Sequence, residues 1–521
     1  MPEGFPQPNT DSRRLFWILF ITVTIAAVLS CFFDLGRHRL TGWDESAHTE
    51  FSREMVETGI WLDTLNEGRV FFDKPPLVTW ITAGFFEILG TSEGVARIPS
   101  ALGGVGTVLA VFLIGARLMS PWTGFLASLF LLTNAVFLQQ SRQVSPDGPL
   151  SFVVILAIYF WVRYGNTAAG LAGYALCFAA GLMMKHVGAA PPFGAMFLVM
   201  LFEAWRQGRP WGVVAAASTG VALALPWHLL MWARHGREFW GPYFVRELFG
   251  RIKAPVTGGD HRWYQFFSWL ALRYPFSWLT ALELPGARFW ILAATAAGTV
   301  IAYSVPANRI IWYMSPAIPP VAVLAAAAVE SDWRRRQGLG TMLVGGLVVA
   351  WEMNDRFHEP GVAITAAAVM LAWVAARKWN LARPAAVALL SVVLMHELRI
   401  GSRVWSKTPT EADQVADVLM SVRAEENLDG QHWQMTPIVA MEWHPAGYYY
   451  ARRPVFPRER CRTAAGDLLA CISISRPFYL LGRRVDVERI EGWQAKLVKQ
   501  TGDAFVLRLD NEPSPSAAMR H

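Results

Sequence analysis

Mostly apolar stretches recur along the first four fifths of the chain, and short polar segments separate them. Stretches of about 17 to 25 apolar residues have the length of a helix that crosses a bilayer. The pattern therefore predicts a mainly α, polytopic membrane protein with about 13 transmembrane helices. The predicted spans are residues 15–33, 95–118, 123–137, 150–162, 170–183, 189–202, 213–232, 266–282, 289–303, 318–329, 340–351, 362–375 and 384–395.

Lysine and arginine in the short connections fall at alternate ends of these spans. Such residues accumulate on the cytoplasmic side of a membrane, so this end is expected to face the cytoplasm. The N-terminus then lies inside, and an odd number of spans places the tail beyond Ser402 outside. The basic positions are Arg13, Arg14, Arg117, Arg163, Arg206, Arg209, Arg288, Arg334 to Arg336, Arg377, Lys378 and Arg383.

The composition supports a membrane protein. Hydrophobic residues make up 53% of the chain, which has 24 tryptophans, and the mean hydropathy is +0.29. These values indicate a bilayer as the main solvent. The net charge of +7 and the pI near 9.3 fit the topology and contact with anionic lipid better than nucleic acid, since no segment resembles a nucleic-acid-binding module. Membrane lipids are thus expected partners, and nucleic acid is not.

The pattern changes after the last span. Apolar runs shorten to strand length, as at residues 437–441 and 478–481, and an amphipathic helix is expected over 411–424. The sequence therefore predicts a transmembrane domain over 1–401 and a soluble α/β domain over 402–521.

The cysteines fall into two pairs. Cys31 and Cys177 lie within predicted spans, where packing is their expected role. Cys461 and Cys471 lie in the outward tail, where an oxidising compartment permits a disulfide. Spacing alone does not establish that bond, so it stays open.

A long outward segment, residues 34–91, separates the first two spans. A helix is expected over 46–58, with Phe51, Met55 and Val56 on one face and charged residues on the other, so that it lies in the membrane interface. Asp44 comes just before this helix, close to the bilayer edge. Two roles are open for its carboxylate, a general base or a helix cap.

Lys74 lies further along the same segment, before Pro75 and Pro76. Paired prolines stiffen the turn, because each fixes its own φ and restricts the residue before it. A lysine held in this way near the headgroups can bind a phosphate as a point charge. The alternative is a lysine that snorkels at a span entrance.

A series of short motifs, each weak alone, resembles one family by its order and spacing. That family is the aminoarabinose-transferase and protein O-mannosyltransferase-like group, which are integral-membrane glycosyltransferases of the GT-C fold. The resemblance covers residues 13–326 and, through the outward domain, most of the rest. The motifs are Asp44-Glu45, Glu50 to Met55, Gly59-Ile60-Trp61, Lys74-Pro75-Pro76-Leu77, Ala96-Arg97-Ile98-Pro99-Ser100, Asp147-Gly148-Pro149-Leu150, Gly181-Leu182-Met183-Met184-Lys185, Pro226-Trp227-His228, and Arg309 with Tyr313 and Pro316.

The resemblance implies a sugar donor carried on a polyprenyl phosphate such as undecaprenyl phosphate, and an inverting transfer to a lipid or glycan acceptor. It implies a bacterial inner-membrane protein with its site and tail in the periplasm. Asp44 would be the base or orient the acceptor, with Asp147 or Glu45 as the second carboxylate. The residues expected at the donor phosphate are Lys74, Lys185, Arg251 and Arg309, and those expected at the substrate are His48, Glu247, His261 and Tyr313.

The chemistry of the reaction agrees with these roles. A lipid-phosphate leaving group already carries negative charge, so its departure needs cations more than a proton donor. The acceptor oxygen must be held on the opposite face of the sugar, where a carboxylate can remove its proton.

Departures from the family leave the sugar and the acceptor open. Residues 47–50 read Ala-His-Thr-Glu where aminoarabinose transferases typically have Arg-Tyr-Ala-Glu, and Asp73 replaces the family's Glu before Lys-Pro-Pro. His48 lies one helical turn from Asp44, so a divalent metal near Asp44, Asp147 and Glu247 also stays open, and no cofactor is certain.

Two further alternatives concern a loop and the function. The loop over 233–262, rich in arginine, glycine and aromatic residues, is either a lid that orders over substrate or an ordinary packed loop. A transporter or flippase for a polyprenyl-linked lipid would also need many spans and basic headgroup contacts. A non-catalytic scaffold for envelope assembly is the third class. Turnover of a polyprenyl-phosphate sugar distinguishes the enzyme from both.

Overall fold

The computed structural model describes most of the N-terminal two thirds of the chain and the strands of the tail. The described residues are 10–37, 39–40, 42–66, 68–250, 264–267, 275–282, 286–306, 309–336, 341 and the strands β3 to β7. The chain divides into two compact units. The first comprises residues 1–33, 72–78 and 98–406, and the second comprises residues 34–71, 79–97 and 407–521.

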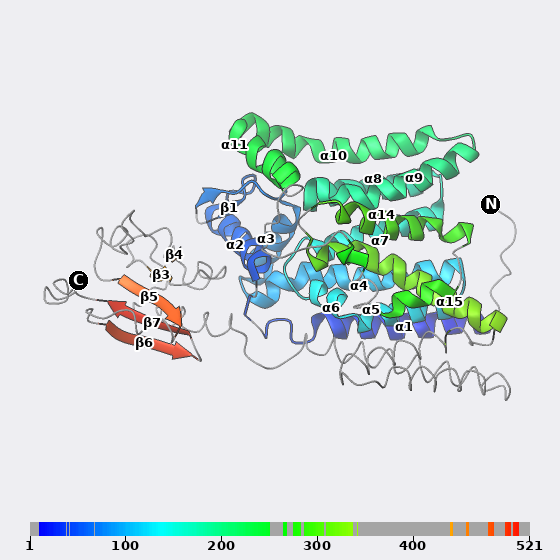
Figure 1. Cartoon of the computed structure of the whole chain (residues 1–521), viewed down its shortest axis with the longest axis horizontal. Coiled ribbons are helices and arrows are strands. Elements are labelled where there is room, and N and C mark those ends of the chain that lie inside the picture. Colours follow the sequence, from blue (N-terminus) through cyan, green and yellow to red (C-terminus); the bar gives the residue numbers. More distant parts are fainter. Residues whose placement is uncertain are drawn as a thin grey trace. The chain divides into compact units, whose positions relative to one another are not determined.

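Long apolar helices build the first unit, and Figure 1 shows them running side by side. Six stretches within the described residues are long and apolar enough to cross a membrane, or seven if one bent pair is a single span. One of them, Ala168–Arg206, holds two of the predicted spans. The chain is thus a multi-pass membrane protein. The helices are α1 (Thr10–Phe32), α4 (Glu93–Leu118), α7 (Asp147–Tyr164), α8 (Ala168–Lys185), α9 (Ala190–Arg206), α10 (Trp211–His235), α14 (Trp290–Ser304) and α15 (Ile318–Arg336).

Short helices complete the description of this unit. They are the 3₁₀ helices η1 (His186–Ala189), η3 (Pro275–Leu282), η4 (Ala287–Phe289) and η5 (Ile311–Ala317), the α-helix α11 (Arg237–Trp240) and the π-helix η2 (Gly241–Gly250). The predicted span over 266–282 is described only in part, with residues 266–267 α-helical and residues 275–282 in the 3₁₀ helix η3. The last three predicted spans lie outside the described residues, so the count of about 13 stays a prediction.

The predicted span over 123–137 is broken into two helices. These are α5 (Pro121–Thr133) and α6 (Ala135–Ser141), which meet at an angle of 77°. Asn134 produces the break, since its Oδ1 accepts a hydrogen bond from the Phe137 backbone N–H at 2.9 Å and so starts a new helix. The bend brings the chain toward the start of α7.

Close glycine contacts hold neighbouring helices together. A Cβ on Gly115 of α4 would lie 2.8 Å from the backbone of Gly124 on α5, so these two helices approach backbone to backbone. On α10, a Cβ on Gly220 would lie 3.0 Å from the Ala175 carbonyl of α8. In lipid, no hydrophobic driving force brings helices together. Small residues at such crossings instead allow the helices to pack closely.

The second unit begins with α2 (Gly42–Thr58), the hairpin β1 (Leu65–Asn66) and β2 (Arg69–Val70), and α3 (Leu77–Leu89), whose first two residues belong to the other unit. Helix α3 was not predicted, because its 13 residues are too few for a span. Helix α2 was predicted to lie in the membrane interface with its charged residues on one face, and the structure buries much of that face. Glu50, Arg53 and Glu54 are each less than 5% exposed.

Internal ion pairs explain how α2 buries this face. Arg53 Nε donates to Glu50 Oε2 at 2.9 Å and the same guanidinium pairs with Glu57, while the Gly68 backbone N–H donates to Glu54 at 3.3 Å. Burial opposes the charge on Arg53, but the two carboxylates outweigh it and raise the pKa of Arg53 above its usual value. The polar face therefore packs inside the unit.

A five-stranded sheet occupies the tail. Its strands are β3 (Ile438–Ala440), β4 (Val455–Pro457), β5 (Phe478–Arg483), β6 (Ala495–Thr501) and β7 (Ala504–Leu509), in the order β4-β3-β5-β7-β6. Strand β3 pairs in parallel with β4 and β5, whereas β7 is antiparallel to both of its neighbours.

Strands β3 and β5 fall on the two apolar runs that the sequence singled out, 437–441 and 478–481. The expected helix over 411–424, Cys461 and Cys471 lie outside the described residues. The soluble α/β domain over 402–521 therefore stays a prediction.

Candidate active site

A buried ion pair between Asp147 and Lys185 lies at one end of the helices of the first unit. Asp147 opens α7 and is 2% exposed, and Lys185 closes α8 and is 6% exposed. The Lys185 Nζ donates to Asp147 Oδ1. An aspartate at a helix N-terminus and a lysine at a helix C-terminus both suit the helix dipole. Both residues were predicted to belong to the site, with separate roles, and the structure pairs them.

The lengths of the two helices were the signal for this pairing. Helices α7 and α8 are each 18 residues long and are joined by a three-residue connection, residues 165–167. Two adjacent antiparallel helices of equal length return the chain to its starting level. The first residue of α7 and the last residue of α8 therefore come to the same end of the hairpin.

Aromatic side chains flank the lysine. The Lys185 Nζ lies 4.2 Å from the ring centroid of Tyr313, on η5, and the Tyr313 ring lies 5.6 Å from that of Tyr303, on α14. The Tyr303 hydroxyl donates to the Gly188 carbonyl, three residues beyond Lys185. A buried cation over a ring face is stabilised by the ring quadrupole. Tyr313, expected at the substrate, thus lies against the ion pair.

The turn before α7 is tightly constrained. The Ser145 Oγ donates to Gln140 Oε1 at 2.7 Å, and the Ser151 Oγ donates to the Asp147 carbonyl at 2.8 Å. A Cβ on Gly148 would lie 2.5 Å from the Gln140 carbonyl oxygen, so only glycine fits there. These contacts fix the backbone on which the Asp147 carboxylate is carried.

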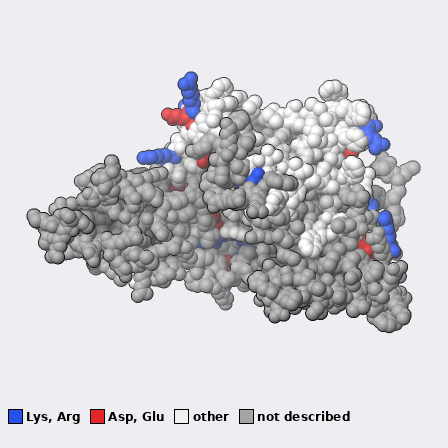
Figure 2. Space-filling view, viewed as in Figure 1, with Lys and Arg blue, Asp and Glu red and all other residues white. Residues whose placement is uncertain are grey.

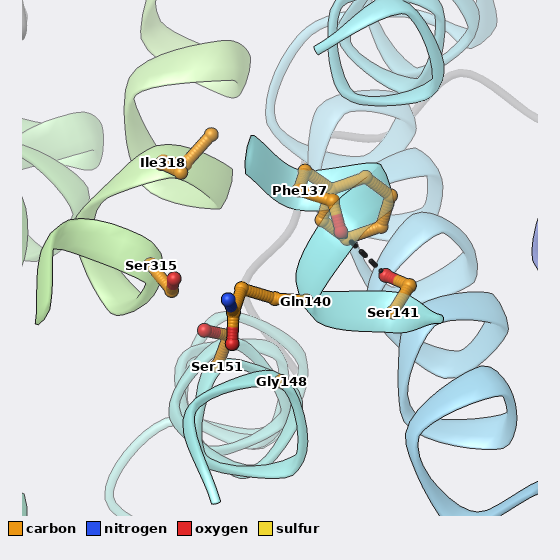
Figure 3. Close-up of a pocket in the computed structure, with 7 residues that line it drawn as sticks. All are labelled: Phe137, Gln140, Ser141, Gly148, Ser151, Ser315 and Ile318. Carbon is orange, nitrogen blue, oxygen red and sulfur yellow. Dashed lines mark hydrogen bonds between the residues drawn. The ribbon is translucent and has the colours of Figure 1, made fainter. Parts of the chain in front are cut away.

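A small cavity of about 10 Å³ lies between this turn and η5, as Figure 3 shows. Its lining includes Gln140, Gly148 and Ser315. The Ser315 Oγ is buried and has no hydrogen-bond partner among the described residues. The volume is about that of one water molecule, so the cavity is too small for a substrate.

Two arginines cap helix ends near this site. Arg309 donates from Nε and Nη2 to the Ser304 carbonyl at 3.0 and 2.8 Å, at the end of α14. Arg309 therefore has a structural role in addition to the role expected for it at the donor phosphate. Arg142, which the sequence analysis missed, donates to the carbonyls of Ser30 and Phe33 at 3.0 and 2.7 Å and so caps α1.

Lys74 and Phe72, two positions before it, belong to the first unit. Lys74 is half-buried on the turn between β2 and α3. The Phe72 ring lies 5.1 Å from the His235 ring and 5.8 Å from the Phe239 ring. The lysine therefore follows an anchored aromatic residue, and its stiff Pro75-Pro76 pair leads directly into α3.

Asp44 and Glu45 lie in the second unit, in the first turn of α2. The helix begins at Gly42, so the prediction that Asp44 precedes it is wrong, and Asp44 is a half-buried residue of the first turn. Glu45 is 2% exposed and accepts hydrogen bonds from Arg97 at 2.8 and 3.2 Å. Arg97 also binds the carbonyls of Leu35 and Arg39. The Glu45 carboxylate is thus committed to Arg97, which argues against its expected catalytic role.

The remaining candidates are placed less completely. His48 is 2% exposed and its ring lies 5.6 Å from that of Phe51. The Glu247 backbone lies in η2, and its side chain is outside the described residues, as are Arg251 and His261. Among the described side chains, no group of three His, Cys, Asp or Glu is arranged to hold a metal ion.

Comparisons with known proteins agree with this architecture. Residues 73–232 match the family model of dolichyl-phosphate-mannose-protein mannosyltransferase. A protein of Pseudomonas fluorescens, the undecaprenyl phosphate-alpha-4-amino-4-deoxy-L-arabinose arabinosyl transferase 2, is 26% identical over 64% of this chain and 63% of its own length. The chain thus matches just under two thirds of the length of the curated relatives that it resembles.

Solved structures show the same fold. ArnT from Cupriavidus metallidurans bound to undecaprenyl phosphate has a TM-score of 0.68 at 18% identity, covering 94% of this chain and 97% of that one. The archaeal oligosaccharyltransferase AglB from Archaeoglobus fulgidus has a TM-score of 0.53 at 13% identity, covering 92% and 70%.

The chain therefore has the GT-C fold of the integral-membrane glycosyltransferases. Its sequence is similar to the arabinosyl transferase of Pseudomonas fluorescens and its fold to that of ArnT, which confirms the resemblance that the ordered motifs indicated.

Proposed function

We propose that the chain is an inverting glycosyltransferase that moves a sugar from a polyprenyl phosphate to a lipid or glycan acceptor on the periplasmic side of the bacterial inner membrane. The observation that carries this proposal is the buried Asp147–Lys185 pair at the end of a GT-C helical bundle. A buried, paired carboxylate beside aromatic side chains costs folding free energy and is typical of a functional site in a membrane protein.

The reaction breaks the bond between the sugar C1 and the phosphate oxygen and forms a bond between C1 and an acceptor oxygen on the opposite face. The electron pair of the broken bond leaves with the polyprenyl phosphate, and the acceptor hydroxyl gives its proton to a carboxylate. Lys74 stabilises the departing phosphate by its charge. Asp44 receives the proton and orients the acceptor.

The structure changes the role that we assign to Lys185. Its ammonium is held by the Asp147 carboxylate and lies over the Tyr313 ring. We therefore assign Lys185 to positioning Asp147 and assign the donor phosphate to Lys74, with Arg309 and Arg251 as further candidates. Glu45, committed to Arg97, is assigned to the support of α2.

A transfer assay tests the proposal. Purified protein in lipid nanodiscs is incubated with an undecaprenyl-phosphate sugar and an envelope glycolipid extract. Acceptor-dependent release of undecaprenyl phosphate is the expected result, with 4-amino-4-deoxy-L-arabinose as the first sugar because the Pseudomonas fluorescens relative carries it in its name. Movement of intact donor across the bilayer without release would support a flippase, and no turnover with any donor would support a scaffold.

The orientation gives a first prediction. Figure 2 shows basic side chains near α11 and also at the end of the helical unit where α9 joins α10. The Arg163 and Arg206 guanidinium groups lie 5.0 and 5.9 Å from the neighbouring rings of Tyr164 and Phe202. This end suits the cytoplasmic headgroup layer.

Alkaline phosphatase fused after His521 is expected to be active, because this enzyme folds only outside the cytoplasm. A fluorescent protein fused at the same position that fluoresces in the cytoplasm would contradict the predicted odd number of spans.

Lys74 gives a second prediction. Substitution Lys74→Ala removes one charge-assisted contact, which is worth about 1.5–3 kcal/mol, so the affinity for undecaprenyl phosphate is expected to fall by about 10-fold to 150-fold. Lys74→Arg keeps the charge and is the matched control. Equal affinity in the alanine variant and the unsubstituted protein would reduce Lys74 to an interface anchor.

A further inference from the structure

An aromatic cluster in the first unit lies between the two basic segments of the candidate site. We define the Tyr243 cluster as Phe72, His186, Trp227, His228, Phe239 and Tyr243. Tyr243 is 2% exposed and Phe239 is 1% exposed. The members come from four separate segments of the chain: the turn before α3, the residue after α8, α10, and the region formed by α11 and η2.

The Tyr243 ring is the centre of this cluster. It lies 4.6 Å from the Phe239 ring in a stacked arrangement, 5.2 Å from the His186 ring and 6.0 Å from the Trp227 ring. Burial raises the pKa of Tyr243, so its hydroxyl stays protonated. Packing of this kind between several rings gives a rigid centre, because each ring restricts the rotation of the next.

A single hydrogen bond fixes the orientation of the tyrosine. The His228 Nδ1 lies 2.8 Å from the Ala224 carbonyl, which can only accept, so Nδ1 carries the proton. The Nε2 of the neutral ring is then an acceptor, and it lies 2.6 Å from the Tyr243 hydroxyl. Tyr243 therefore donates to His228. Its backbone is part of a π-helix, a geometry that is rare and is frequently found at functional sites.

The cluster touches each basic segment beside its lysine. Phe72, which packs on Phe239, precedes Lys74 by two residues, and His186, which packs on Tyr243, follows Lys185 directly. Beyond Lys74 the chain is held again, because Pro75 and Pro76 are buried and Val78 is part of the apolar core. Lys74 thus lies on a short turn that is fixed on both sides.

We infer that the Tyr243 cluster positions Lys74 for the donor phosphate and sets its place relative to the Asp147–Lys185 pair. Phe72 and Tyr243 are then positioning residues, which act through Lys74 without touching the substrate. This inference rests on the proposed function, because it needs Lys74 to bind the phosphate. The inference adds uncharged side chains to the residues on which the proposed function depends.

The test is a double-mutant cycle with undecaprenyl phosphate as the binding probe. The Lys74 contact is worth about 10-fold to 150-fold in affinity, so Phe72→Ala, which displaces the lysine, is expected to weaken binding by about 10-fold to 100-fold. Tyr243→Phe keeps the ring and removes only the donor to His228, and a smaller loss is expected. In a Lys74→Ala background both substitutions should have no further effect, because their action passes through Lys74.

Controls separate positioning from folding. Phe72→Leu keeps most of the apolar volume and should retain binding. If the Phe72→Ala variant does not fold, the cycle is carried out with Tyr243→Phe, which keeps the ring. Tyr164→Phe, on a half-exposed tyrosine at the other end of α7, should leave binding unchanged.

The outcomes are distinct for the two proposals. If Phe72→Ala and Tyr243→Phe weaken binding by the same factor with and without Lys74, the inference is overturned while the donor role of Lys74 stands. If Lys74→Ala alone leaves binding unchanged, the donor role fails and the inference falls with it.

Discussion

The substitution Asp44→Asn is expected to lower turnover by about 100-fold to 10,000-fold, the usual cost of losing a general base. Asn keeps the shape of the side chain and can still accept a hydrogen bond, but it cannot take a proton. Binding of undecaprenyl phosphate should be retained, because the phosphate is assigned to Lys74. The measurement is the initial rate of transfer at saturating donor, together with the affinity for undecaprenyl phosphate.

The structure allows this effect to be separated from a loss of stability. Asp44 is half-buried in the first turn of α2, where one negative charge contributes about 0.3–1 kcal/mol to the helix. The melting temperature of Asp44→Asn should therefore change little. Near-normal turnover in this variant would reduce Asp44 to a helix-end residue.

Two other carboxylates of the same unit are useful controls. Asp34 forms an exposed ion pair with Arg37 and has a φ of 53°, which asparagine also adopts, so Asp34→Asn should change neither stability nor turnover. Glu45→Gln weakens the buried contacts with Arg97 and should lower the melting temperature. Loss of turnover without loss of stability is thus expected at Asp44 alone of these three residues.

The size of the Asp44 effect also reports on the acceptor. A sugar or lipid hydroxyl must lose its proton during transfer, so base catalysis contributes in full. An anionic phosphate acceptor has no such proton, and only the orienting contribution would remain. A small loss with phosphate acceptors and a large loss with hydroxyl acceptors would identify the proton transfer itself as the role of Asp44.

Much of the helical architecture could be predicted from the sequence, because the bilayer requires long apolar stretches whose ends are marked by polar residues. The spans over 95–118 and 213–232 agree with α4 and α10 to within a few residues. The break at Asn134 was missed, since a helix that restarts at a side-chain cap leaves no interruption in hydropathy. The 13-residue helix α3 was missed because it is apolar but too short to span.

Hydropathy could not predict which polar residues pair with partners far away in the sequence. The residues Glu50, Arg53 and Glu54 were predicted to form the charged face of an interfacial helix, and their burial was not predicted, because the charge pattern of a helix does not show whether those charges are satisfied inside the protein. Glu45 was named as catalytic from the motif alone, and its contact with Arg97 joins residues 52 positions apart. The contact between Asp147 and Lys185 could have been predicted from the equal lengths of α7 and α8, since this needs only hairpin geometry.

Breaking the Asp147–Lys185 pair from either side is expected to be strongly destabilising. Both side chains are buried, so Asp147→Asn removes the carboxylate that binds the Lys185 ammonium and Lys185→Met removes the ammonium that binds the Asp147 carboxylate, each at a cost of about 3–5 kcal/mol. The double variant carries neither charge and should regain most of the lost stability. Apparent melting temperatures in detergent measure this cycle, and Glu93→Gln, in a partly exposed pair with Arg39, is the control that should cost no more than about 1 kcal/mol.

Turnover then separates the structural role of the pair from its role in the reaction. If the Asp147 carboxylate acts on the acceptor and Lys185 positions it, the stable double variant should bind undecaprenyl phosphate and transfer no sugar. Substantial transfer by the double variant would show that the pair only stabilises the α7–α8 hairpin. A double variant no more stable than the weaker single variant would show that the two charges are not energetically coupled. In the expected case, the buried charge is retained at a cost in stability because the reaction needs a carboxylate held in one place.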